Sequence, residues 1–357
     1  MTKYKLENIA TLKYGKLPDK NKISAKKTKM NKYPIFTGYK VTGYYPEYIF
    51  SDSEVIVVAR GVGGTGDVKL SPKKAFITNL SIVIQVDKKI VNKKYLQLLL
   101  NSMNLRRLDS GSAQSQITIT HLKSFEVDLP PKDIQDKIAD KISLIERKMQ
   151  LNKQINANLD ELMSEIFERY VTETNVFTTD SLSNIANYKN GLAMQRFRPN
   201  GADKGLPVLK IKELNQGFTD SSSDRCSSKI SNDVIVKTGD IIFSWSGTLI
   251  VKIWTGTTCG LNQHLFKVTS DKYPKWFIYK WTEYYLRQFQ SIAAGKATTM
   301  GHIKRSDLKQ AEVKIPYKSE IDRLDKLISP IFKRYVNNIL EINSLKELKN
   351  ELLSKLF

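Results

Sequence analysis

The chain has 357 residues, of which 41% are hydrophobic and 10% aromatic, and its formal net charge is +21. This composition excludes extended disorder, and the length suits two domains of about 130 to 180 residues that each bury a core. No stretch approaches the roughly 18 apolar residues of a membrane span, and residues 1–10 lack the apolar segment of a secretory signal, so we expect a cytoplasmic protein.

The first third of the chain has the pattern of a mixed α/β domain. Residues 6–12 open it, residues 53–59 and 76–86 are predicted strands because they are rich in β-branched side chains, and residues 91–108 are a predicted helix. Residues 15–34, rich in Gly, Lys, Asn and Pro, predict a long exposed loop. The glycine-rich run at residues 61–66 predicts a hairpin turn that lets the backbone approach a ligand.

A long helix is predicted over residues 132–170. This segment has neither Pro nor Gly, and its apolar side chains recur at spacings of four and three residues. Such a spacing, sustained over more than four heptads, is typical of a coiled-coil seam. The stripe consists of Ile138, Ile142, Ile145, Met149, Asn152, Asn156, Leu159, Met163, Ile166 and Tyr170.

The second half repeats the first. Residues 240–244 and 261–268 are predicted strands, residues 274–291 are a predicted helix, and residues 190–205 correspond to the long loop. A Leu-x-x-Ile-Ala segment with a downstream glycine begins at Leu6 and again at Leu182, and all ten stripe positions recur 186 residues later. The second stripe is Leu324, Ile328, Ile331, Tyr335, Asn338, Ile342, Leu345, Lys349, Leu352 and Leu356.

Two polar features interrupt these stripes. Asn152 and Asn338 stand at the same stripe position, where a buried polar residue either fixes the register of a helix pair or is tolerated near an exposed end. Pro330 lies early in the second helix, and we expect it to cause a kink or to delay the start of the helix to near Ile331.

The positive charge lies in two blocks. Residues 1–131 carry a net charge of +12 and residues 171–317 carry +8, whereas residues 132–170 and 318–357 carry −1 and +2. A polyanion that contacts both blocks would release counterions at each, so nucleic acid is the natural partner. Lysine-rich usage in an AT-rich genome is the alternative, but it would not spare the segments in between.

The sequence contains no catalytic constellation. Residues 61–66 lack the GK[ST] of a phosphate-binding loop, and neither GxSxG nor HExxH occurs. The single Pro-Pro pair follows Leu129, not the Asn or Asp of a base methyltransferase. Cys226 and Cys259 lack CxxC spacing, and the three histidines are scattered, which makes a structural zinc or disulfide framework unexpected. We expect no catalytic and no metal-binding residue.

The chain resembles the DNA-specificity subunits of type I restriction-modification enzymes. Both halves begin with the Leu-x-x-Ile-Ala segment and end with a Leu-x-x-x-x-Val-x-x-Pro exit or a close variant of it, at residues 122–130 and 308–316. Further matching segments are residues 37–44, 56–61, 239–244, 262–264 and 352–357. Each motif is weak, but their order and spacing cover essentially the whole chain. One departure is that the expected Gln after the exit proline, Gln135, has Ile321 and Asp322 in its place in the second half.

The resemblance implies an α+β fold with two mixed α/β target-recognition domains, each followed by a long helix. The two helices would pack as an antiparallel coiled coil with pseudo-twofold symmetry. The limits of these parts would be residues 1–131 and 173–317 for the recognition domains and residues 132–172 and 318–357 for the spacer helices.

The resemblance also implies a function without catalysis. The chain would read a bipartite asymmetric site on double-stranded DNA, and the helix length would set the unread gap. Two methyltransferase subunits that use S-adenosylmethionine to modify adenine would dock on it, and two restriction subunits that use ATP and Mg²⁺ could join them. The chain itself would bind none of these cofactors.

Base readout favours Arg or Lys for guanine and Asn or Gln for adenine, on loops that reach the major groove, with further basic residues for phosphates. In the first domain the candidates are Tyr39, Tyr44, Arg60, Gln114 and Gln116 for bases and Lys16, Lys26, Lys27, Lys69 and Lys73 for phosphates. In the second they are Gln195, Arg196, Arg198, Lys210, Trp245, Gln263, His264, Lys296 and Thr298. Arg60 and Gln116 rank above Tyr44 and Trp245, which suit a core equally well.

The helix-helix seam is expected to consist of Ile138, Ile142, Ile145, Met149, Asn152, Leu159, Ile166, Ile331, Tyr335, Asn338, Ile342, Leu345, Leu352 and Leu356. Two other functions remain open at this point. One is a self-contained DNA methyltransferase or nuclease whose motifs have diverged. The other is a coiled-coil adaptor whose charge reflects only genomic bias and which does not bind DNA specifically.

Overall fold

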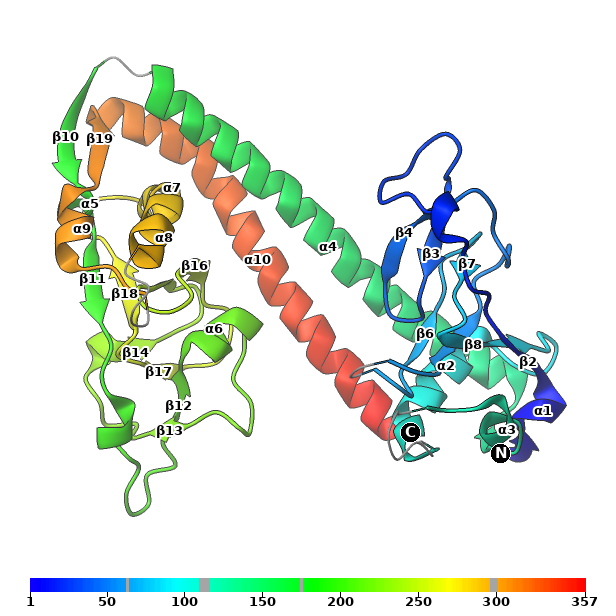
Figure 1. Cartoon of the computed structure of the whole chain (residues 1–357). Coiled ribbons are helices and arrows are strands. Elements are labelled where there is room, and N and C mark those ends of the chain that lie inside the picture. The colour runs from blue at the N-terminus through cyan, green and yellow to red at the C-terminus, as the bar shows by residue number, and fades with distance from the viewer. Residues whose placement is uncertain (62–63, 109–115, 174–175, 296–300) are drawn as a thin grey trace. The chain divides into compact units, whose positions relative to one another are not determined.

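The computed structural model of the chain describes residues 1–61, 64–108, 116–173, 176–295 and 301–357. These residues form two compact units (Figure 1). Unit 1 comprises Met1–Arg147 and Glu347–Phe357, and unit 2 comprises Lys148–Lys346. The two longest helices, α4 (Lys132–Glu173) and α10 (Lys318–Leu356), each contribute a part to both units.

The described residues of unit 1 form three sheets, with strand orders β2-β8-β5-β6, β4-β3-β7 and β1-β9. Its elements before α4 are β1 (Thr2–Lys5), α1 (Leu6–Ile9), β2 (Ala10–Tyr14), η1 (Lys20–Lys22), β3 (Tyr33–Phe36), β4 (Val41–Tyr45), β5 (Val55–Val58), β6 (Val68–Leu70), β7 (Phe76–Ile77), β8 (Ser81–Val86), α2 (Lys93–Ser102), η2 (Leu105–Leu108), α3 (Ile119–Lys123) and β9 (Glu126–Leu129).

The central strand β5 explains why unit 1 holds together. Its four residues, Val-Ile-Val-Val, are all buried because the strand is paired on both edges and covered on both faces. Val55 and Val57 pack with Tyr95 of α2 in one cluster, whereas Ile56 packs with Phe36 of β3 in another. Alternate residues of one strand thus fill two cores, as the two-residue period of a strand requires.

Unit 2 has sheets in the orders β11-β18-β15-β16, β13-β12-β17-β14 and β10-β19. Its elements between α4 and α10 are β10 (Phe177–Ser181), α5 (Leu182–Ile185), β11 (Asn187–Asn190), η3 (Met194–Arg196), β12 (Leu206–Leu209), α6 (Ile211–Gln216), β13 (Arg225–Cys226), η4 (Asn232–Val234), β14 (Ile235–Val236), β15 (Ile241–Ser244), β16 (Ile250–Ile253), β17 (Cys259–Leu261), β18 (Leu265–Thr269), α7 (Lys275–Tyr284), α8 (Leu286–Ala294), α9 (Arg305–Gln310) and β19 (Glu312–Pro316).

The two units repeat one topology. The sheet β2-β8-β5-β6 has its counterpart in β11-β18-β15-β16, and the strand pair β1-β9 has its counterpart in β10-β19. The parallel pairing of β3 with β7 recurs as the parallel pairing of β12 with β17. In both units a mixed α/β region precedes a long helix, as the internal repeat predicted.

Two predicted strands are each divided by a turn. Residues 76–86 form β7 and β8, and residues 261–268 include the end of β17 and most of β18. In each case the chain leaves one sheet and enters another, since β7 pairs with β3 while β8 pairs with β2 and β5. The Ser81 amide donates to the Thr78 carbonyl at 3.1 Å, and the Leu265 amide donates to the Asn262 carbonyl at 3.0 Å.

Two predicted helices are also divided. Residues 91–108 form α2 and the 3-10 turn η2, because Asn104 between them adopts a left-handed conformation with φ of 48° that an α-helix cannot continue through. Residues 274–291 are divided between α7 and α8 at Tyr285. The hydroxyl of Tyr285 donates to the carbonyl of Glu312 at 2.6 Å.

The long helices α4 and α10 pair antiparallel. In unit 2, Asn152 contacts Glu341 and Asn156 contacts Asn338, at 2.7 and 2.8 Å, and in unit 1 Lys349 contacts Glu146 at 2.6 Å. As the residue numbers rise along α4 they fall along α10. Of the residues predicted for the seam, Ile142, Asn152 and Asn338 are buried, and Ile138, Ile145, Met149, Leu159, Ile166, Ile331, Tyr335, Ile342, Leu345, Leu352 and Leu356 are partly buried. Ile138 packs against the core of unit 1, and Ile166, Ile331 and Tyr335 pack against the core of unit 2.

The prediction that Pro330 delays the start of the second helix is wrong. Helix α10 begins at Lys318 and continues through Pro330. The proline ring lies on the exposed face, while Leu324, Ile328 and Phe332 on the other face are buried in the core of unit 2. This burial holds the turns on both sides of the proline and offsets the loss of one backbone hydrogen bond.

Candidate nucleic-acid interface

Four segments of unit 1 meet at the ends of its strands. They are Lys16 after β2, Arg60 after β5, the turn at residues 78–80 between β7 and β8, and Gln116 before α3. We call this set the strand-end junction of unit 1. It brings together Lys16, Arg60 and Gln116, three of the residues that the sequence proposed as DNA contacts.

Backbone hydrogen bonds hold the junction. Arg60 and Gln116 pair as an isolated antiparallel bridge, and Lys16 pairs in parallel with Thr78. The preceding Gly15 allows the close approach, because a Cβ at this position would lie 2.3 Å from the carbonyl oxygen of Thr78. The amide-to-carbonyl distances are 2.9 Å from Lys16 to Ile77, 3.1 Å from Asn79 to Lys16, 2.9 Å from Ala59 to Leu80 and 2.8 Å from Ile117 to Ala59.

The side chains of the junction are accessible. Lys16 and Arg60 are exposed, and Asn79 and Gln116 are partly buried. Their backbone is fixed by hydrogen bonds, and the exposed side chains of Lys16 and Arg60 can contact a ligand without reorganising the core.

Tyr39 and Lys69, predicted separately to contact a base and a phosphate, lie close together in unit 1. The Tyr39 side chain is 59% exposed, and the Lys69 ammonium lies 6.0 Å from its ring centroid. A Cβ on Gly64 would lie 3.2 Å from the ring, so this glycine leaves room for the tyrosine. The loop of residues 61–66 connects the antiparallel strands β5 and β6, as the hairpin prediction required, although residues 62 and 63 lie outside the described residues.

The other predicted residues of unit 1 lie elsewhere. Tyr44 is partly buried in β4, and its amide and carbonyl bond to Ser24 in the same loop as the exposed Lys26 and Lys27. Lys73 is near the start of β5, at the opposite end of that strand from Arg60, and lines a pocket with Asp52. Gln114 lies outside the described residues.

Unit 2 has the same strand-end junction with different side chains. Ser246 and His302 form the antiparallel bridge, Leu192 pairs with Asn262, and the turn is at residues 262–264. A Cβ on Gly191 would lie 2.2 Å from the Asn262 carbonyl oxygen. The amide-to-carbonyl distances are 2.9 Å from Leu192 to Leu261, 3.3 Å from Trp245 to His264 and 3.1 Å from Ile303 to Trp245.

Of the residues predicted for this unit, Trp245, Gln263 and His264 lie in the junction. The indole of Trp245 donates to the Asn190 side chain at 3.0 Å and stacks on Phe266 with ring centroids 5.7 Å apart. The Gln263 amide nitrogen lies 3.3 Å from His264 Nε2. All three side chains are partly buried, so Trp245 packs against its neighbours and is also partly accessible to solvent.

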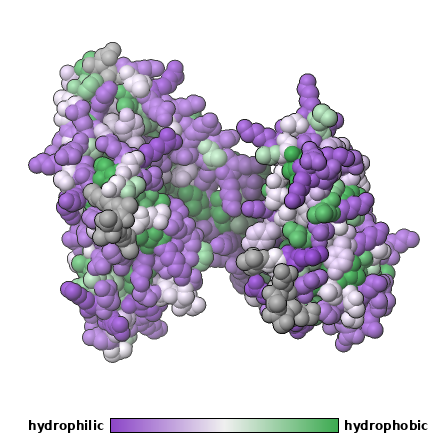
Figure 2. Space-filling view, in the orientation of Figure 1, coloured by the Kyte–Doolittle hydropathy of each residue, from purple (hydrophilic) through white to green (hydrophobic). Residues whose placement is uncertain are grey.

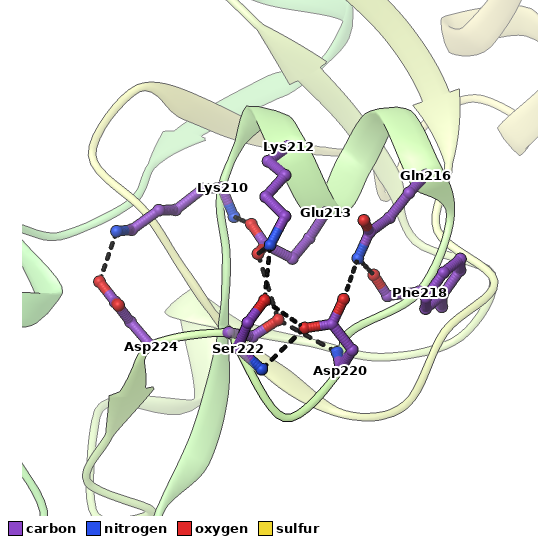
Figure 3. Close-up of polar contacts among 9 residues, drawn as sticks. Lys210, Lys212, Glu213, Gln216, Phe218, Asp220, Ser222 and Asp224 are labelled. Carbon is purple, nitrogen blue, oxygen red and sulfur yellow. Dashed lines mark hydrogen bonds and ion pairs between the residues drawn. The ribbon is translucent and has the colours of Figure 1, made fainter. Parts of the chain in front are cut away.

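Gln195, Arg198 and Lys210 line a separate pocket of 470 Å³, with Asn262 of the junction on its wall. The Lys210 ammonium forms an ion pair with Asp224, and this hydrogen bond lowers the pKa of the Asp224 carboxyl (Figure 3). Lys210 therefore has less charge to offer a phosphate than its sequence position suggested. Arg196 is exposed beside this pocket, and Lys296 and Thr298 lie outside the described residues.

Sequence reasoning missed two residues of the junctions, Asn79 and His302. The repeat could have indicated His302, which is 186 residues after Gln116. Asn79 is identified only by the turn at residues 78–80, where it takes the place that Gln263 has in unit 2. Gln135, which the sequence singled out beside the exit proline, is 1% exposed. Its side chain accepts from the Asn92 amide and donates to the carbonyls of Ile90 and Pro130, so it fastens α2 to α4.

Within the described residues, no group of three or more His, Cys, Asp or Glu side chains could hold a metal ion. Cys226 and Cys259 are buried, and burial raises the pKa of both thiols, which disfavours the nucleophilic thiolate. No helix in the described part of the chain is both long and apolar enough to cross a membrane. Figure 2 shows hydrophilic side chains over most of the visible face of each unit.

Comparison with known proteins matches the family described as "Type I restriction modification DNA specificity domain" to residues 1–161 and 175–353. The type I restriction enzyme MjaIX specificity subunit of Methanocaldococcus jannaschii is 23% identical over 340 residues, 86% of this chain and 77% of that protein. The EcoBI specificity subunit of Escherichia coli is 25% identical over 182 residues, 49% of this chain and 37% of that protein.

A crystal structure of the type I restriction-modification S subunit from M. genitalium has the same fold. It matches with a TM-score of 0.73 at 16% identity and covers 100% of this chain and 96% of that one.

Proposed function

The chain belongs to the type I restriction-modification DNA specificity domain family, and from this membership we propose how its two units recognise DNA. It is a DNA-specificity subunit. Residues 1–131 and 173–317 are target-recognition domains that each read one part of a bipartite asymmetric site on double-stranded DNA. Residues 132–172 and 318–357 are spacer helices whose length sets the unread gap. The observation that carries this proposal is the repetition of one strand-end junction in two basic regions.

The helices would also dock the partner subunits. Exposed apolar side chains follow α4 at Leu144, Leu151, Ile155 and Leu162, at spacings of seven, four and seven residues, away from the seam with α10. Such a stripe suits packing against helices of another protein. We assign it to two methyltransferase subunits, which would use S-adenosylmethionine, with restriction subunits that use ATP and Mg²⁺ joining the complex. Catalysis would reside in these partners, and the complex would modify or cleave DNA in the cytoplasm.

DNA binding is tested by titrating salt. A reader that contacts phosphates loses affinity steeply between 50 and 200 mM salt, by a factor of about 10³ to 10⁵ for six to ten phosphate contacts. A coiled-coil adaptor would show no saturable binding under any of these conditions. Incubating the purified chain with DNA and a labelled methyl donor tests the enzyme alternative, since methyl transfer without a partner would overturn a function in recognition alone.

The spacer function is tested by deleting one heptad from both α4 and α10. Each helix loses seven residues, about 10 Å of rise, while the seam keeps its period. The gap between the two preferred half-sites should change and the base preferences should stay the same. An unchanged gap would contradict the spacer function.

A further inference from the structure

The two strand-end junctions share a backbone but differ in side chains, and we infer that they are the base-reading edges of the two units and that each reads DNA with different chemistry. Unit 1 pairs the backbones of Arg60, whose side chain is exposed, and Gln116, whose side chain is partly buried. Unit 2 presents the amide of Gln263 and the imidazole of His302. This inference rests on the proposed function, and it names the residues that determine the sequence of each half-site.

The equivalence of the two junctions comes from hydrogen bonds, not from sequence similarity. In both units the residue before the bridge accepts from the segment that enters the next helix, as Ala59 accepts from Ile117 and Trp245 accepts from Ile303. In both, the same residue donates to the third residue of the turn, Leu80 or His264. Arg60 therefore corresponds to Ser246, Gln116 to His302, Asn79 to Gln263 and Lys16 to Leu192.

A structural role would not produce this pattern. Equivalent backbones in equivalent packing would favour similar side chains, as they do at Gly15 and Gly191, where any Cβ would collide with a carbonyl oxygen. Among the side chains that differ, Arg60 is exposed, Gln116, Gln263 and His302 are partly buried, and Ser246 is buried. Recognition of two different sequences requires the same rigid backbone in both units and different polar side chains on it.

The side-chain chemistry of each junction predicts which base it contacts. A guanidinium fits the O6 and N7 acceptors of guanine, and an amide fits the N6 and N7 groups of adenine. Arg60 has no charged counterpart in unit 2, where Ser246 is 5% exposed and cannot reach a groove. Gln263 lies 3.3 Å from the imidazole of His264, which holds its amide in place. We therefore assign a guanine contact to Arg60 and an adenine contact to Gln263.

The experiment selects duplexes from a randomised library with the full-length chain and repeats the selection with variants. Arg60→Ala and Gln116→Ala should each relax preference in one half-site, and Gln263→Ala and His302→Ala in the other. Lys89→Ala and Lys272→Ala are matched controls, because both lysines are exposed and follow the equivalent strands β8 and β18, at the ends of these strands away from the junctions. Thermal unfolding of each variant checks that the fold is intact.

The contacted atom is tested with modified bases. Replacing the guanine assigned to Arg60 by 7-deazaguanine removes the N7 acceptor, and it should weaken binding of the wild-type chain about 5- to 100-fold but leave the Arg60→Ala variant unaffected. The same comparison with 7-deazaadenine tests Gln263.

The outcomes separate the inference from the function. If the wild-type chain selects no bipartite sequence, the proposed function fails. A second outcome is that the wild-type chain selects a bipartite sequence that all four alanine variants also select without change. If those variants, Arg60→Ala, Gln116→Ala, Gln263→Ala and His302→Ala, are folded, the proposed function stands and the inference is wrong. Variants of one unit that alter both half-sites equally would also overturn it.

Discussion

Replacing Asn156 and Asn338 by leucine, singly and together, tests the polar contact between α4 and α10. Asn338 is 1% and Asn156 8% exposed. The Asn338 amide donates to Asn156 Oδ1 at 2.8 Å, and the Asn156 amide donates to the Tyr335 carbonyl at 3.1 Å. Within the described part of the chain, Asn338 Oδ1 is buried without a hydrogen-bond partner. A buried polar atom without a partner costs about 1 to 3 kcal/mol.

These contacts predict unequal effects. Asn338→Leu removes the unpartnered oxygen but leaves Asn156 Oδ1 without its donor, so the free energy of unfolding should stay near the wild-type value. Asn156→Leu leaves both polar atoms of Asn338 without partners and should destabilise by about 1 to 3 kcal/mol. The double variant removes every unpartnered atom and should be more stable than the wild type by about 1 to 3 kcal/mol.

Urea unfolding followed by circular dichroism of the helices measures all four proteins, with the exposed Asn337→Ala as a control. The reasoning requires a strong coupling between the two positions in this double-mutant cycle. It is refuted if the two single changes add up to the double one, or if Asn156→Leu is as stable as the wild type.

Three further perturbations test other contacts by the same unfolding measurement. Lys280 is 2% exposed and contacts Asp160 at 2.9 Å and Glu283 at 2.7 Å; Lys280→Met should cost about 1 to 3 kcal/mol, less than a fully buried pair, because both acids are partly hydrated. Gly191→Ala should destabilise unit 2, whereas Gly295→Ala, whose added Cβ would lie 3.7 Å from its nearest neighbour, should have little effect. Hydrogen bonds from two serines and a glycine hold the pKa of Asp203 below its usual 3.8, so their stabilisation is complete above that pH and is lost as the pH falls. The destabilisation by Asp203→Asn should accordingly be present at pH 6 and shrink toward pH 3.

The long helices and the repeat could be predicted because their signals are local. A spacing of four and three residues specifies a helix face wherever the helix lies, and the offset of 186 residues transfers it to the second half. Pro330 was misjudged because the burial of Leu324, Ile328 and Phe332 outweighs the local preference of proline, and that burial depends on residues far along the chain.

The strand-end junction could be predicted only in part. Arg60 and Gln116 were chosen as single residues with suitable chemistry, but nothing local shows that their backbones pair. That pairing needs the turn at residues 78–80, where the chain passes between two sheets. This turn was not predicted, because residues 76–86 are mostly apolar and β-branched and have the pattern of a single strand. His302 was missed because a lone histidine carries no signal until its counterpart Gln116 is known to lie at a junction.

In the strand-end junction the backbone provides stability, which leaves the side chains to determine recognition. Its backbone is held by hydrogen bonds and by a glycine that no other residue can replace without collision, so the frame does not depend on which polar side chain occupies the rim. Exposed positions such as Arg60 can change at little cost in stability, because surface substitutions usually change it by no more than about 0.5 kcal/mol. Ser246 is different, since its burial leaves no room for an arginine. Unit 2 therefore cannot acquire at this position the guanine contact that we infer for Arg60, and on this inference new sequence preferences in unit 2 would arise through Gln263 and His302.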